Sequence, residues 1–300
     1  MTTVILLGAI LLPALLVLGV LLVWRYIRRR DRRRSPLTFN VLNLPGEGLR
    51  RSIEKHDEAF NEKTALVIIA GPVVLASWLL ARMDRVVEDW SLIQLGWGDA
   101  LFAVLGVVVI GWGTWGLIHH ASSRRKYLQG RAAELAVAQC LMPLMAEGAL
   151  VYHDLPADKF NIDHIVIGQG AVFAIETKSR RKPAEGGRES ARVDYDGTRL
   201  KFPKHVETKP IDQARRQAQW LARFLESGVG EPIRVIPVLA LPGWYTQNSV
   251  QRPDVLVTNC HNPGFMVGSK FGEAFSPAMR KRIAHVLTRQ YPPMEDPGRS

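Results

Sequence analysis

Two charged residues near the middle of the chain have the types and spacing of a small catalytic centre. Glu176 and Lys178 lie two positions apart, after the apolar run 172–175, whose composition is typical of a buried strand. Side chains two apart leave the same face of a strand, so a carboxylate and an ammonium would stand together where the strand leaves its core. Such a pair can orient a nucleophile or neutralise a phosphate, although a solvated ion pair has the same signature.

A third acidic residue strengthens the chemical interpretation. Asp163 lies in the apolar segment 161–167, and Gly-Gln-Gly at 168–170 is a hairpin signal before the strand that carries Glu176. Counting outwards from this turn makes Asp163 and Glu176 near neighbours. Two carboxylates near a core need a metal or a proton to compensate their charge, and oxygen ligands suit Mg²⁺ or Mn²⁺. We therefore expect a divalent-metal site for phosphodiester hydrolysis, with Lys178 orienting the nucleophile or neutralising the phosphate.

The remaining signals are weaker. His164 should point to the sheet face opposite Asp163 and is expected to be packed. Two cysteines, Cys140 and Cys260, are too few for a disulfide framework or a zinc site, which favours a reducing cytosol. The net charge of +11 suits a polyanionic partner, either nucleic acid or anionic lipid. A group of basic residues could bind along a phosphate backbone, and a solvated protein surface explains the same residues equally well. They are Lys201, Lys204, Lys209, Arg215, Arg216 and Arg223.

The elements that must position these residues follow an α-β-β-β-α-β order, which predicts an α/β domain with a mixed sheet. The continuous apolar run 233–241 is typical of a central strand covered on both faces. Asp196-Gly197 marks a second hairpin within 191–202. The other expected elements are helices at 132–145, 210–225 and 277–289, and strands at 149–155, 161–167, 171–178 and 255–258.

Three uncharged stretches before this domain, 4–24, 64–81 and 100–118, are long enough to span a bilayer as helices. Arginines crowd residues 25–34, and basic residues also occupy 124–126, so the positive-inside rule places both flanks in the cytoplasm. The expected topology is an N-terminus outside and a C-terminal domain inside. A buried helical hairpin in a soluble domain is the alternative for the second and third stretches.

Four segments recur in a characteristic order and spacing, and they are Gly-Arg-Ala-Ala-Glu at 130–134, Asn-Ile-Asp-His at 161–164, Gly-Ala-Val-Phe-Ala-Ile-Glu-Thr-Lys at 170–178, and Pro210 with Gln213. By these segments the region 126–245 resembles the NERD (nuclease-related) domain of the PD-(D/E)xK nuclease superfamily, although the first segment lacks a second glycine directly before Glu134. The resemblance implies a restriction-endonuclease-like core, here preceded by three transmembrane helices.

The resemblance also implies roles for single residues. Mg²⁺ or Mn²⁺ would be the cofactor, and nucleic acid the partner, with DNA favoured over RNA. A domain that binds nucleic acid or protein without cleaving is the alternative, because a fold does not fix a function. The implied roles are metal ligands at Asp163 and Glu176, a backbone carbonyl ligand at Thr177, the catalytic lysine at Lys178, an accessory metal ligand or water-orienting acid at Glu134 and an outer helper at Gln213.

Together these patterns divide the chain into parts of a multi-pass protein of the bacterial inner membrane. The sequence indicates no oligomeric state. The parts are a transmembrane helix with its basic flank at 1–34, a cytoplasmic loop at 35–63, two transmembrane helices with a short periplasmic loop at 64–120, the nuclease-like domain at 126–245 and a C-terminal extension at 246–300.

Overall fold

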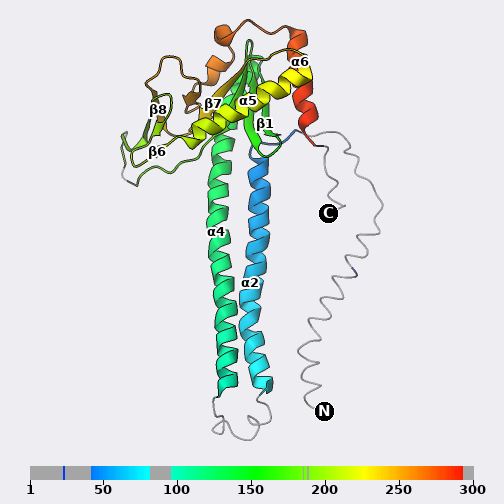
Figure 1. Cartoon of the computed structure of the whole chain (residues 1–300), viewed down its shortest axis with the longest axis vertical. Coiled ribbons are helices and arrows are strands. Elements are labelled where there is room, and N and C mark those ends of the chain that lie inside the picture. The colour runs from blue at the N-terminus through cyan, green and yellow to red at the C-terminus, as the bar shows by residue number, and fades with distance from the viewer. Residues whose placement is uncertain (1–22, 24–41, 82–95, 185, 188, 293–300) are drawn as a thin grey trace. The chain divides into compact units, whose positions relative to one another are not determined.

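The described part of the chain falls almost entirely in one structural unit. A computed structural model describes residue 23 and residues 42–81, 96–184, 186–187 and 189–292. Every helix and strand discussed below lies in the unit Leu42–Gln290 (Figure 1). The first expected membrane segment, except for Val23, lies outside the described residues, as do the arginine cluster and nearly all of the expected periplasmic loop.

Two long helices, α2 (Glu47–Ala81) and α4 (Trp97–Ala146), lie side by side (Figure 1). Both are long and apolar enough to cross a membrane, and their most apolar windows are only 6% and 17% buried. Glycines allow the close contact: a Cβ at Gly113 would overlap Val67, and one at Gly116 would lie 3.2 Å from Lys63 Cγ. The helices do not form the buried hairpin of a soluble core, because their apolar side chains remain exposed.

The two helices are longer than the sequence pattern predicted. The expected loop at 35–63 is helical from Glu47 onwards, and α2 continues through Pro72. The third apolar stretch and the first helix of the domain are one continuous helix, α4, without a break between 118 and 132. The physical reason is that this connection contains no proline and only one glycine, Gly130, so the change from apolar to basic residues does not interrupt the backbone hydrogen bonds.

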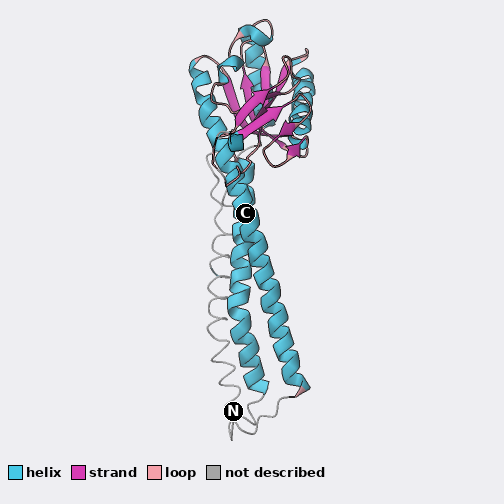
Figure 2. Ribbon diagram, turned by 90° about the vertical axis from the view of Figure 1, so that its left-hand side faces the viewer, coloured by secondary structure: helices cyan, strands magenta, loops and turns pink. Residues whose placement is uncertain are grey.

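A five-stranded mixed sheet follows α4, with the order β1-β2-β3-β7-β9. The first three strands form the expected antiparallel meander, and β3, β7 and β9 are parallel. The predicted central strand is confirmed, since β7 lies between β3 and β9. Figure 2 shows the strands lying among helices. The bounds are β1 (Leu150–Pro156), β2 (Asn161–Ile167), β3 (Val172–Thr177), β7 (Val235–Ala240) and β9 (Leu256–Thr258).

A second, four-stranded sheet has the order β6-β5-β4-β8. Its β4–β5 hairpin is the one that Asp196-Gly197 predicted, and Gly197 has the positive φ of 94° that such a turn requires. The expected C-terminal extension is part of the domain, because β8 completes this sheet and β9 completes the main one. The bounds are β4 (Arg192–Tyr195), β5 (Leu200–Lys201), β6 (Val206–Glu207) and β8 (Tyr245–Asn248).

Helices cover the main sheet on both faces. The end of α4 packs Val137 and Leu141 on one face, against Phe173 and neighbouring apolar side chains. The helix α5 (Lys209–Val229) lies between β6 and β7 in the chain and packs Ala214 in one apolar cluster with Leu239 on the other face. It begins with a proline in its first turn and ends at Gly230, which adopts the left-handed conformation. The last helix is α6 (Pro277–Gln290).

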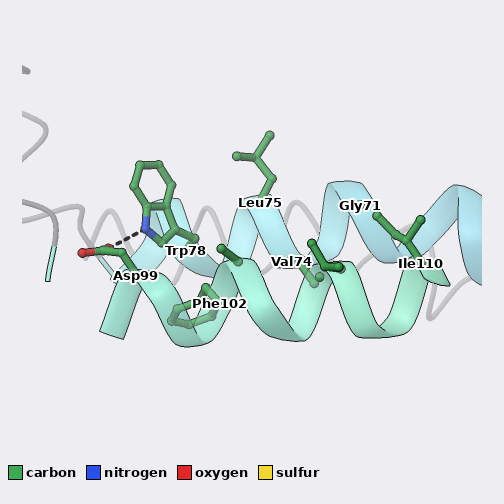
Figure 3. Close-up of a pocket in the computed structure, with 10 residues that line it drawn as sticks. Gly71, Val74, Leu75, Trp78, Asp99, Phe102 and Ile110 are labelled. Atoms are coloured by element: carbon green, nitrogen blue, oxygen red, sulfur yellow. Dashed lines mark hydrogen bonds between the residues drawn. The ribbon is translucent and has the colours of Figure 1, made fainter. Parts of the chain in front are cut away.

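A cavity of about 470 Å³ lies between α2 and α4, near the ends of these helices that are far from the sheet. Its walls are almost entirely apolar. Figure 3 shows its one polar pair, in which the indole N–H of Trp78 donates to Asp99 Oδ1 at 2.7 Å. This hydrogen bond joins the two helices across their apolar contact.

Candidate active site

The β2–β3 hairpin brings two carboxylates together at the end remote from its turn. His164 pairs with Ile175, so the next positions outwards, Asp163 and Glu176, lie opposite each other on one face of the sheet. The backbone N–H of Thr177 donates to Asp163 Oδ2 at 2.6 Å. Asp163 is half-buried and Glu176 is only 2% exposed. Both acids therefore sit where the strands leave the core, as the sequence predicted.

Two further side chains hold Glu176 in place. Lys178 forms a salt bridge with Glu176 Oε1, and its own side chain remains 24% exposed. From α5, Gln217 donates through Nε2 to Glu176 Oε2 at 2.5 Å and to the Asn161 carbonyl at 3.2 Å. The glutamine thus fixes one carboxylate oxygen while the lysine neutralises the other, and the lysine stays accessible to a substrate.

The third acid, Glu134, reaches this cluster from α4. It is 8% exposed, and burial followed by the charges of Asp154 and Glu176 raises its pKa to about 8. Burial and the charge of Glu176, followed by that of Glu134, also raise the pKa of Asp163 well above its usual range. The positive charge of Lys178 lowers the pKa of both acids. One lysine does not balance the charge of three carboxylates, so a bound cation would stabilise the site.

The family comparison agrees with this geometry. Residues 129–242 match the model of NERD, the nuclease-related domain. The chain contains a nuclease-related domain. Comparisons with curated proteins and with solved structures give no match. The matched region runs from within α4 to residue 242, two residues after β7, and it contains Glu134, Asp163, Glu176, Lys178 and Gln217.

The structure places the remaining expected residues as follows. Gln217, rather than Gln213, is the glutamine that contacts Glu176; Gln213 lies one helical turn earlier and is half-buried. Thr177 contributes its N–H to Asp163, while its hydroxyl is buried without a partner. His164 is fully buried, with its Nδ1 2.8 Å from that of His153, and burial lowers its pKa to about 3. His164 is therefore a packed, neutral histidine, as expected.

Sequence reasoning missed Gln217 and Asp154. A signal for Gln217 was present, because it is a polar residue within the apolar stripe of α5, between Ala214 and Leu221. Asp154 is a buried acid within β1, 4% exposed, and has the unusual positive φ of 48°. No local pattern of β1 distinguishes it from the flanking polar residue His153.

The donor set in the nuclease-related domain fits a hard divalent cation by its chemistry. No group of three or more histidine, cysteine, aspartate or glutamate side chains among the described residues is arranged to hold a metal ion. Mg²⁺, however, is commonly held by one or two carboxylates together with water and substrate phosphates. Asp163 and Glu176 provide such a pair, and their surplus negative charge favours the cation.

Part of the expected basic surface is neutralised within the domain. Arg215 forms ion pairs with Asp254 and Asp212, and Lys201 lies 3.8 Å from Asp196. Arg216 and Arg223 are exposed on α5. The exposed arginines remain available for a phosphate backbone, whereas Arg215 has a structural partner.

Proposed function

We propose that the chain is a membrane-anchored, divalent-metal-dependent nuclease with a restriction-endonuclease-like core that hydrolyses phosphodiester bonds in nucleic acid, with DNA favoured over RNA. The observation that carries the proposal is the gathering of Asp163, Glu176 and Glu134 around Lys178 within the nuclease-related domain. Structural carboxylates are not normally concentrated in this way, because each raises the free energy of ionising the others.

Each side chain then has a chemical role. Asp163 and Glu176, with the backbone carbonyl of Thr177, would hold Mg²⁺ or Mn²⁺, which stabilises the negative charge that develops on the phosphate. Lys178 is accessible enough to contact a scissile phosphate or to orient a water. Glu134 has a pKa of about 8 in the metal-free protein, and a bound cation would lower this pKa, so that Glu134 would be ionised beside the metal and could orient a water. Gln217 keeps Glu176 in position, and Gln213 is proposed as an outer helper.

The anchoring rests on α2 and α4. Their exposed apolar side chains and glycine-mediated contact are typical of helices that pack within lipid. Basic residues at 124–126 support the proposed orientation, with the domain end of α4 in the cytoplasm of a bacterium and the helices in the inner membrane. The uncharged stretch 4–24 is proposed as a third span.

The experiment uses the full chain in detergent micelles, with supercoiled plasmid, single-stranded DNA or RNA as substrate. Each substrate is incubated with Mg²⁺, Mn²⁺ or EDTA. Cleavage should require metal and should be lost in Lys178→Ala, while the control Lys182→Ala, an exposed lysine four residues later, should retain it. If the folded wild type cleaves none of the substrates, binding of nucleic acid or protein without cleavage becomes the better assignment.

A further inference from the structure

Asp154 of β1 forms hydrogen bonds with the segment 43–48, which comprises the first residues of α2 and the residues just before them. Its carboxylate accepts from the backbone N–H of Gly48 at 2.5 Å and from Asn161 Nδ2 at 2.8 Å. Its backbone carbonyl accepts from Asn43 Nδ2 at 2.8 Å. The Gly48 contact links residues 106 positions apart in sequence. One buried acid therefore connects β1 both to the neighbouring strand and to the start of α2.

The hydrogen bond from the Gly48 N–H to Asp154 caps the N-terminus of α2, although Asp154 is distant in sequence. The first backbone hydrogen bond of α2 runs from Arg50 N–H to the Gly46 carbonyl, which makes Gly46 the residue that precedes the helix. Glycine has no side chain to accept from the free N–H groups of the first turn. Asp154 accepts from one of them in its place.

The capped segment lies directly against the acid of α4. A Cβ at Gly46 would lie 2.9 Å from Arg131 Cγ and 3.4 Å from Glu134 Oε2, and one at Gly48 would lie 2.9 Å from Asn161 Nδ2. Gly46 has a positive φ of 72° that favours glycine, and at Gly48 a larger residue would require the Asn161 side chain to move. The segment 43–48 therefore forms one wall around Glu134, outside the residues that match the family.

We propose that Asp154 is a positioning residue that holds the segment 43–48 against Glu134 and thereby completes the site. The proposal rests on the proposed function of that site. It makes the start of α2 part of the catalytic unit, although α2 begins 82 residues before the start of the matched region. Asp154 acts on Glu134 through Gly48 and Gly46, in addition to the direct effect of its charge on the pKa of Glu134, and it need not touch the substrate.

The test compares Asp154→Ala, Asp154→Asn and wild type as full chains in micelles. Asp154→Ala removes both acceptors, so the amides of 43–50 should exchange with deuterium faster. Its kcat should fall about 10- to 100-fold, as for other residues that orient a site, with KM for DNA unchanged. Asp154→Asn retains one acceptor oxygen and should recover part of both effects. Asp158→Ala, the same change at an exposed position of the β1–β2 hairpin, should leave both unchanged.

The two readouts separate this proposal from the proposed function. A folded Asp154→Ala variant with wild-type kcat, or with wild-type exchange at 43–50, would overturn the positioning role. A fall in kcat that Asp154→Asn does not relieve at all would also count against it. If the wild type cleaves nothing, the proposed function fails, and the exchange measurement alone decides whether Asp154 holds the segment.

Discussion

The charge on Glu134 should make the metal-free protein less stable as the pH rises. Burial and two neighbouring acids raise its pKa from 4.5 to about 8. Between these values the folded state binds a proton that the unfolded state has released, so the free energy of unfolding falls with increasing pH. The slope for one such group is at most about 1.4 kcal/mol per pH unit. For a chain with 150 to 250 ordered residues this corresponds to a decrease in Tm of about 3–6 °C per pH unit.

The assay is thermal unfolding of the full chain in micelles with EDTA, followed by tryptophan fluorescence between pH 5 and pH 8.5. The matched variant is Glu134→Gln, which keeps the shape of the side chain and removes the ionisable group. Its Tm should depend less on pH, and it should exceed the wild-type Tm most clearly near pH 8. Mg²⁺ or Mn²⁺ should raise the wild-type Tm more at pH 8 than at pH 5.5, because protons compete with the cation. Parallel pH profiles for wild type and variant would refute the assignment of the buried charge to Glu134.

Three further results are expected. Gln217→Ala should lower kcat about 10- to 100-fold in the plasmid assay, because Glu176 loses its donor, while Gln213→Ala should have a smaller effect. Gly113→Ala should lower the Tm of the full chain, since its Cβ overlaps Val67 and such overpacking costs about 1–3 kcal/mol, while Gly111→Ala, with open space, should not. Expressed in bacteria, the chain should stay in the membrane fraction after carbonate washing, and its appearance in the soluble fraction would exclude the proposed anchoring.

The core of the site was predictable because its determinants are local. The turn at 168–170 sets the register of one hairpin, and the alternation of side chains along a strand then fixes which residues share a face. This is enough to place Asp163 beside Glu176 and to put Lys178 on the same side. The α-β-β-β-α-β order followed similarly from the hydrophobic periodicity of short segments.

The contacts that the sequence did not reveal depend on packing between distant elements. Gln217 meets Glu176 from 41 positions away, and which turn of α5 lies over the end of β3 is set by the fit of its apolar stripe on the sheet. The sequence pattern indicated Gln213, one helical turn before the glutamine that contacts Glu176 in the structure. Hydropathy likewise predicted two separate helices, because it changes between the apolar and the amphipathic part of α4. The helix is continuous because its backbone hydrogen bonds are not interrupted at that change.

The continuity of α4 gives the site a mechanical connection that the family match alone does not describe. Glu134 and the apolar stretch belong to the same helix, α4. This helix has 50 residues and is about 75 Å long at 1.5 Å per residue. The partner helix α2 reaches the same acid at its own first turn, through Gly46 and the cap from Asp154. Both helices of the apolar pair therefore reach Glu134, α4 from within its own length and α2 at its first turn. A shift of one helix along the other is therefore expected to change the surroundings of Glu134 more than those of Asp163 and Glu176, which the β2–β3 hairpin holds.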